Sequence, residues 1–74
     1  MYNLNKLVGK NIRALRETLK ISQEKLADMA NYHRTYIGAI ERAERNITLE
    51  TLENLAKALN VEPCELIKKN KNVQ

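Results

Sequence analysis

Side chains that commonly do chemistry are few in this sequence, and their spacing does not favour an enzyme. There is one histidine, His33, one cysteine, Cys64, and two glycines that stand alone. A Cys–His nucleophile would need two distant residues to meet, and a phosphate-binding loop would need a glycine-rich run. Glu50 and Glu53 share a helical face, where surface charge is the usual interpretation and acid–base catalysis the rare one. We therefore expect no catalytic residue, no metal site and no cofactor.

The segment that begins at Arg34 could do a different kind of chemistry, the reading of base edges in duplex DNA. A helix fits the major groove, and the donors, acceptors and methyl groups of its first turn can contact bases. Arg34 can donate a bidentate pair of hydrogen bonds to guanine, and Thr35 can bond a base or touch a thymine methyl group. With the apolar side of the segment facing a core, Gly38 projects outward and permits close approach. Pairing of Arg34 with phosphate or solvent remains the alternative.

Polar residues on either side of this segment are candidates for contacts with the DNA backbone. Gln23 opens the preceding helix, whose N-terminus carries a partial positive charge that favours a phosphate. For Thr48, simple capping of a helix is an equal alternative. His33 is most simply a capping or surface residue, with phosphate contact as the second interpretation. The residues expected to contact backbone are Gln23, His33, Arg42, Arg45, Asn46 and Thr48.

Basic residues outnumber acidic ones and gather in particular parts of the chain. The sequence has 13 lysines and arginines against 9 acidic residues, a formal net charge of +4. This excess is by itself weak evidence for a nucleic-acid partner, and its distribution says more. The first expected helix and the residue directly after it include Lys6, Lys10, Arg13, Arg16 and Lys20. Many of the acids fall late in the chain, at Glu50, Glu53, Glu62 and Glu65. One basic face and one more acidic face are therefore expected.

Apolar residues recur at three- and four-residue steps through most of the chain, which is the period of amphipathic helices. The sequence shows no strand-like alternation, internal repeat or low-complexity segment. The pattern predicts an all-α fold, a compact five-helix bundle that forms a single domain over residues 1–74. The expected helices cover residues 4–19, 23–30, 34–42, 49–59 and 63–69. The tail from Asn70 to Gln74 is expected to fray.

Local signals set the ends of these helices. Asn3, Ser22 and Thr48 can each accept a hydrogen bond from an otherwise unpaired amide at a helix start. Asn31 tolerates a positive φ and can close the second helix. Pro63 suits a first helical position, because its missing N–H needs no intrahelical partner there. The short break between the second and third helices makes the pair a helix-turn-helix pattern.

Glu41 is expected to form an ion pair inside the fold. It lies on the same side of its helix as Ile37 and Ile40, which face the core. A carboxylate on that side would be partly buried and would need a cation. We expect Arg16 to be that cation.

The size of the chain and its single cysteine suggest its oligomeric state and its location in the cell. A domain of 74 residues buries only about 60–65% of its unfolded surface, so association with a second copy is expected to stabilise it. One cysteine allows no internal disulfide, and Cys64 is expected to be a small buried or interfacial side chain. No apolar run is long enough to cross a bilayer. We expect a cytoplasmic protein with no membrane partner and no small-molecule ligand.

Three segments carry a family resemblance. In order and spacing, the sequence resembles the Cro/repressor-like (XRE-type) helix-turn-helix family, which has the lambda-repressor-like DNA-binding fold. The matching segments are SQEKLA, RTYIGAIER and RNITLETLENLAKAL. Within this family, RTYIGAIERAERNIT is most similar to the controller proteins of restriction–modification systems. Asn31 and Ala43 depart from the pattern, since both stand where many relatives have glycine.

The resemblance implies a homodimer that binds a symmetric operator upstream of its own gene. Such controllers activate and later repress the promoter of the controller and the endonuclease, which would make RNA polymerase a further partner. By position, Arg34, Thr35 and Tyr36 would contact bases, and Arg16 and Glu41 match the structural ion pair of the family. The dimer interface implied by the fourth and fifth helices is formed around Leu59, Leu66 and Ile67.

Other functions remain open on the same fold. A phage- or plasmid-type repressor shares much of the motif. An antitoxin-like protein-interaction module could keep the fold without DNA binding, since fold alone does not fix function. An RNA target is less favoured, because the three tyrosines are not set out as a stacking platform.

Overall fold

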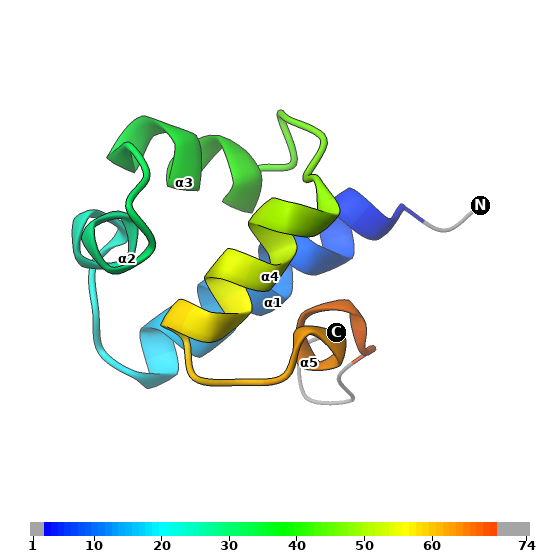
Figure 1. Ribbon diagram of the computed structural model, residues 1–74. Helices are drawn as coiled ribbons and strands as arrows, with labels where there is room; N and C mark the ends of the chain where they lie inside the picture. The colour runs from blue at the N-terminus through cyan, green and yellow to red at the C-terminus, as the bar shows by residue number, and fades with distance from the viewer. Residues whose placement is uncertain (1–2, 70–74) are drawn as a thin grey trace.

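The computed structural model describes residues 3–69, which form five helices and, within that range, no strand (Figure 1). The helices are α1 (Leu4–Thr18), α2 (Gln23–Ala30), α3 (Arg34–Glu41), α4 (Leu49–Ala58) and α5 (Pro63–Ile67). The predicted all-α fold and all five helices are confirmed, with α2 predicted to the residue. The other four helices end one or two residues earlier than expected. The expected frayed tail, Asn70 to Gln74, lies outside the described residues.

The predicted helix starts are confirmed by their capping bonds. The side chain of Asn3 accepts from the amide of Lys6 at 3.1 Å, and Ser22 accepts from Lys25 at 2.9 Å. Thr48 caps α4 in the same way, accepting from the amide of Thr51 at 3.0 Å. Pro63 occupies the start of α5, as expected. Each polar cap satisfies an amide that the helix itself leaves unpaired.

Four chain turns after helices use a left-handed residue that is not glycine. They are Lys20, Asn31, Ala43 and Asn60, with φ between 58° and 63°. Asparagine tolerates this conformation, but the Cβ of alanine or lysine costs about 1 kcal/mol there. At the end of α3, the amides of Ala43 and Glu44 bond back to Ile40 and Ala39. Ala43 thus keeps the turn geometry that glycine supplies more easily.

Replacing Ala43 with glycine should therefore stabilise the protein by about 1 kcal/mol, because the positive φ is then free of Cβ strain. Chemical unfolding followed by circular dichroism would measure this. Ala58→Gly is the matched control. Ala58 lies in the last turn of α4, where glycine should destabilise by about 1 kcal/mol. A loss of stability in both variants would contradict the turn geometry described here.

Every helix contributes to one apolar core. Its largest fully buried side chains are Ile12, Leu26, Ile37, Leu55 and Leu66, one from each helix in order. α2 and α3 pack on one another, α3 also contacts α1, and α2 contacts α4. The short α5 closes the core by packing on both α1 and α4 (Figure 1). None of the described helices is long and apolar enough to cross a membrane.

Two buried residues of α1 that the sequence did not single out hold other helices in place. A Cβ on Gly9 would lie 2.5 Å from the carbonyl oxygen of Ile40 and 2.8 Å from that of Glu41. The backbones of α1 and α3 therefore touch at Gly9. Asn11 is 4% exposed and donates from Nδ2 to the carbonyls of Leu66 and Lys68, each at 2.9 Å. Asn11 thus ties the end of α5 to α1.

Candidate nucleic-acid interface

The predicted helix-turn-helix is present in α2, the residues after it and α3 (Figure 1). Asn31 ends α2 in the left-handed conformation, with φ of 63° and ψ of 46°. The amide of Tyr32 then bonds the carbonyl of Ala27 at 2.8 Å, which completes the turn. Ala27 is 2% exposed and small enough for the two helices to pack closely. α3 is thereby held across α2 with its first turn on the surface.

Arg34 and Thr35 form the exposed first turn of α3. Within residues 3–69, neither side chain makes a hydrogen bond or ion pair. The guanidinium of Arg34 and the hydroxyl of Thr35 are therefore free to bond an external partner. Their outward position agrees with the expectation from the sequence.

Gly38 does not project outward, and the expectation that it permits close approach is wrong. It is buried, because the side chains of Arg42 and Gln23 cover it. A Cβ at this position would lie 3.0 Å from Nη1 of Arg42 and 3.6 Å from Oε1 of Gln23. Arg42 lies one helical turn after Gly38, so its long side chain can fold back over the glycine. Gly38 makes room for these two side chains rather than for DNA.

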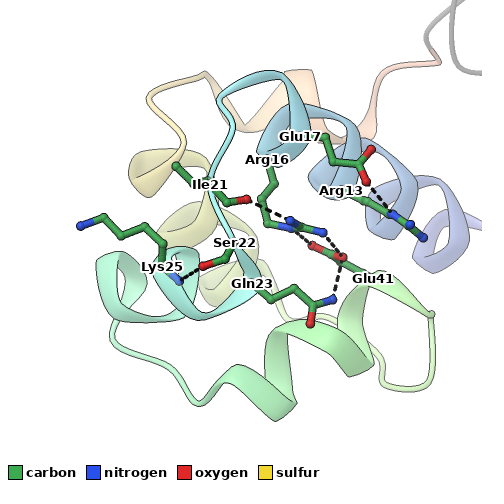
Figure 2. A network of polar contacts seen from close by, with 8 residues as sticks. All are labelled: Arg13, Arg16, Glu17, Ile21, Ser22, Gln23, Lys25 and Glu41. Carbon is green, nitrogen blue, oxygen red and sulfur yellow. Dashed lines mark hydrogen bonds and ion pairs between the residues drawn. The ribbon is translucent and has the colours of Figure 1, made fainter.

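The ion pair between Arg16 and Glu41 is present and joins α1 to α3 (Figure 2). Nε and Nη2 of Arg16 donate to the two carboxylate oxygens at 2.8 and 3.2 Å. Nη1 of Arg16 donates to the carbonyl of Ile21 at 2.9 Å. The side chain of Glu41 is only 3% exposed, and that of Arg16 13%. The hydrogen bond with Glu41 raises the pKa of Arg16.

Gln23 is part of the same network, as Figure 2 shows. Its Nε2 donates to Oε1 of Glu41 at 3.0 Å. A side-chain amide has two N–H donors, so one remains for another acceptor. The buried pair therefore also fixes the direction of the Gln23 amide at the start of α2. The sequence suggested that the Gln23 amide could support a phosphate contact or reach a base, but not that Glu41 would orient it.

Tyr36 is anchored on the flank of α3. It is half-buried, and its ring lies 5.1 Å from that of Tyr32 at an angle of 55°. Its hydroxyl lies 3.3 Å from Oγ1 of Thr51 on α4. The guanidinium carbon of Arg45 lies 5.3 Å from the centre of the Tyr36 ring, within cation–π range. Tyr36 and Arg45 are therefore presented together beside the first turn of α3.

The loop after α3 contains polar residues that already have partners in the protein. Arg42 donates two hydrogen bonds to Glu44, at 2.9 and 3.1 Å. This contact raises the pKa of Arg42 and lowers that of Glu44. Oδ1 of Asn46 accepts from Asn5 at 2.8 Å, and Oδ1 of Asn5 accepts from the amide of Ile47 at 3.1 Å. The loop is thus fixed against α1, and Arg42 and Asn46 stay exposed.

Thr48 and His33 occupy helix starts in different ways. Thr48 is the capping residue of α4, and its hydroxyl also donates to Thr51 at 3.0 Å. His33 stands at the N-cap position of α3 but makes no side-chain capping bond, so the capping interpretation is wrong and His33 is a surface residue. Cys64 is exposed, which excludes the interpretation of a small buried side chain.

The three residues expected at a dimer interface lie in different environments. Leu59 is 2% exposed and Leu66 is 0% exposed, since α5 folds back and seals both into the core. Their side chains have no surface on which a second subunit could rest, so the expectation is corrected for these two residues. Ile67 is 45% exposed and retains an apolar surface at the end of α5.

The comparisons with known proteins agree with this geometry. A family model described as helix-turn-helix matches residues 12–66, which include α2, α3 and α4. The chain belongs to the helix-turn-helix family. One relative, the control protein C.SmaI of Serratia marcescens, is 46% identical over 65 residues, which cover 88% of this chain and 77% of C.SmaI.

Two solved structures of helix-turn-helix proteins share the fold at similar identity. The restriction-modification controller protein C.AhdI from Aeromonas hydrophila has a TM-score of 0.83 and 40% identity, covering 88% of this chain and 98% of C.AhdI. The P22 c2 repressor, solved in complex with a synthetic operator, has a TM-score of 0.78 and 39% identity, covering 86% of this chain and 97% of the repressor. This helix-turn-helix protein is therefore a DNA-binding transcription regulator and not an enzyme.

Proposed function

We propose that the protein is the controller of a restriction–modification system, which binds a symmetric operator as a homodimer and regulates its own promoter and that of the endonuclease. The similarity to C.SmaI and C.AhdI supports this assignment. The observation that carries the DNA-reading role is the first turn of α3. Within residues 3–69, the side chains of Arg34 and Thr35 are exposed and make no hydrogen bond or ion pair, whereas Gln23, Arg42, Asn46 and Thr48 already have partners in the protein.

In this proposal α3 enters the major groove with its first turn toward the base edges. Arg34 bonds guanine, and Thr35 bonds a base or contacts a thymine methyl group. Tyr36 contacts a base from the flank of α3. The remaining N–H of Gln23 reaches a phosphate at the start of α2, where the helix dipole helps.

The other expected backbone contacts follow from the loop around α3 and from its start. His33 is exposed beside the first turn, and Arg42 and Arg45 place guanidinium groups on the exposed side of the loop. The Nδ2 group of Asn46 is left for a phosphate because only Oδ1 bonds Asn5. The hydroxyl of Thr48 already caps α4. Thr48 would therefore act through its place at the N-terminus of that helix. Phosphate contacts fix the orientation of the protein on the duplex.

A homodimer supplies the second α3 that a symmetric operator requires. Two recognition helices would then lie about 34–36 Å apart in successive major grooves. One module of this size rarely makes a specific interface alone. The exposed Ile67 at the end of α5 is the surface that we assign to the dimer contact. Activation of the promoter would also bring RNA polymerase to the complex.

A repressor of phage or plasmid type is the second candidate. The similarity to the P22 c2 repressor, solved in complex with a synthetic operator, favours it specifically. The two candidates share DNA reading by α3 and differ in the genes they regulate. An adjacent methyltransferase gene and endonuclease gene would select the controller, and neighbouring phage or plasmid genes would select the repressor.

Replacement of Arg34 by alanine tests the reading role of α3. It should weaken binding to the operator and relax the preference at one base pair by about 1–3 kcal/mol. Fluorescence anisotropy with the operator, with its single-base variants and with random duplex would measure both effects. Arg13→Ala is the control, because it removes the same charge from an exposed pair on α1. Equal losses on operator and random DNA would contradict base reading by Arg34.

A salt titration separates DNA binding from a protein-interaction module. Each phosphate neutralised by the protein should steepen the slope of log K against log salt by about 0.9. We expect a steep slope with bulk duplex. A slope near zero would favour an antitoxin-like module on the same fold and would contradict the proposed function.

A further inference from the structure

Thr51 is a buried hydroxyl on α4 at the meeting point of three other hydroxyl groups. It is 6% exposed. The hydroxyl of Thr48 donates to Oγ1 of Thr51 at 3.0 Å, and that of Tyr32 donates to the same oxygen at 3.4 Å. The hydroxyl of Tyr36 lies 3.3 Å away on the third side. Thr51 therefore links the turn of the helix-turn-helix, the flank of α3 and the start of α4.

The hydrogen-bonding capacity of a hydroxyl group sets the direction of these bonds. A threonine hydroxyl has one proton to donate and two lone pairs that accept. Thr48 and Tyr32 occupy both lone pairs of Thr51. The proton of Thr51 must then be donated to Tyr36. Tyr32 donates its proton to Thr51, and its oxygen accepts from Nδ2 of Asn54 at 2.9 Å.

This direction of the bonds determines what the hydroxyl of Tyr36 can do. Its oxygen accepts the proton of Thr51, and its own O–H has no acceptor among residues 3–69. Tyr36 follows the exposed Arg34 and Thr35 in α3 and is itself half-buried, and the guanidinium carbon of Arg45 lies 5.3 Å from the centre of its ring. A free donor on a ring that a cation covers suits an acceptor of high negative potential. Phosphate oxygens and the acceptor edges of bases have this chemistry.

We propose that Thr51 is a positioning residue for DNA recognition, which never touches the DNA but holds Tyr36 as an outward donor. The inference rests on the proposed function, because the acceptor is on the duplex. Thr51 aligns the Tyr36 ring. Because Thr51 donates its own proton to the Tyr36 oxygen, the O–H of Tyr36 stays available for an external acceptor. The two tyrosine contacts are long for O–H···O bonds, so the effect on affinity is modest.

A double-mutant cycle tests the proposal. Thr51→Val removes the hydroxyl at nearly constant shape and should weaken binding to a duplex selected by the wild-type protein by about three- to fivefold. In a Tyr36→Phe background the same substitution should change binding by less than about 1.5-fold, because the group that Thr51 positions is already gone. Thr51→Ser keeps the hydroxyl and should restore wild-type affinity. Circular dichroism and thermal unfolding would verify the fold of each variant.

Tyr32→Phe provides an independent test that leaves Thr51 in place. It frees one lone pair of Thr51, so Tyr36 can turn its proton inward and lose its outward donor. Binding should again weaken, by about twofold to threefold, and again not in the Tyr36→Phe background. This variant covers the case in which Thr51→Val fails to fold.

The outcomes separate the two proposals. Losses that disappear in the Tyr36→Phe background support positioning by Thr51. They place the acceptor on phosphate if random duplex is equally affected and on a base if only the selected duplex is. Equal losses with and without the Tyr36 hydroxyl, or no rescue by Thr51→Ser, would overturn the positioning role while DNA binding stands. Failure of the wild-type protein to bind any duplex would overturn the proposed function and this inference with it.

Discussion

Replacing Arg16 with methionine should lower the free energy of unfolding by about 3–5 kcal/mol. The substitution leaves the Glu41 carboxylate, 3% exposed, without its cation in the interior of the fold. Among residues 3–69, the amide of Gln23 is then the one side-chain donor left to the carboxylate. The attraction in a buried pair offsets the free-energy cost of removing both charges from water. When one partner is lost, the cost of burying the other charge is no longer compensated. Urea unfolding followed by circular dichroism would measure the difference.

Two further variants make this test specific to burial. Arg13 and Glu17 form an ion pair on α1 whose side chains are 65% and 57% exposed. Arg13→Met should therefore cost less than about 0.5 kcal/mol. Combining Arg16→Met with Glu41→Leu should recover most of the lost stability, because no charge is then stranded. If Arg16→Met cost no more than Arg13→Met, the account of a structural ion pair between α1 and α3 would be wrong.

Replacing Gly9 with alanine should destabilise the protein by about 3 kcal/mol, at the upper end of the usual cost of overpacking. The new Cβ would overlap the carbonyl oxygens of Ile40 and Glu41, at 2.5 and 2.8 Å. These are backbone atoms and cannot rotate away, so α1 and α3 must move apart. The same denaturant experiment would measure the loss.

Gly38→Ala is the matched control, since both glycines lie inside helices and neither has a positive φ. The Cβ at residue 38 would meet the end of the flexible Arg42 side chain at 3.0 Å, which can shift. Alanine also favours the helix by up to about 1 kcal/mol. Gly38→Ala should therefore be neutral or slightly stabilising. Similar stability losses in the two variants would show that close approach of α1 and α3 at Gly9 is not what makes that glycine necessary.

The elements of the fold could be predicted because their signals are local. Asn3, Ser22 and Thr48 lie next to the amides that they cap, and the apolar period identifies each helix from its own residues. The Arg16–Glu41 pair was also predictable, because a carboxylate on the apolar side of α3 demands a cation. The end of α5 was harder to predict from the sequence. Lys68 leaves the helix in an extended conformation, and its carbonyl is held by Asn11 from α1.

The errors concern side chains whose position depends on distant parts of the chain. Gly38 lies on the outer side of α3 by periodicity, but Arg42 and Gln23 cover it. Leu59 and Leu66 were placed at an interface, yet the return of α5 onto α1 and α4 buries both. In each case the helix was predicted correctly, and the neighbour that decides exposure came from elsewhere in the chain.

The candidate site shows the same division. The exposure of Arg34 and Thr35 follows from their place in the first turn of α3 and was predictable. The hydroxyl group of Thr51 shares three partners from the turn, α3 and the start of α4. No periodicity within α4 distinguishes this buried threonine from an ordinary core position. Such convergence is visible only once the helices are placed in space.

Selection of bound sites from a random duplex library tests the central claim most directly. The wild-type protein should enrich one sequence made of two symmetric half-sites whose centres lie one helical turn, about 10–10.5 base pairs, or a multiple of it apart. Arg34→Ala should enrich the same arrangement with one base pair per half-site no longer specified. Enrichment of no sequence by the wild-type protein, or of a single half-site without symmetry, would contradict the account of a dimeric regulator that reads DNA with α3.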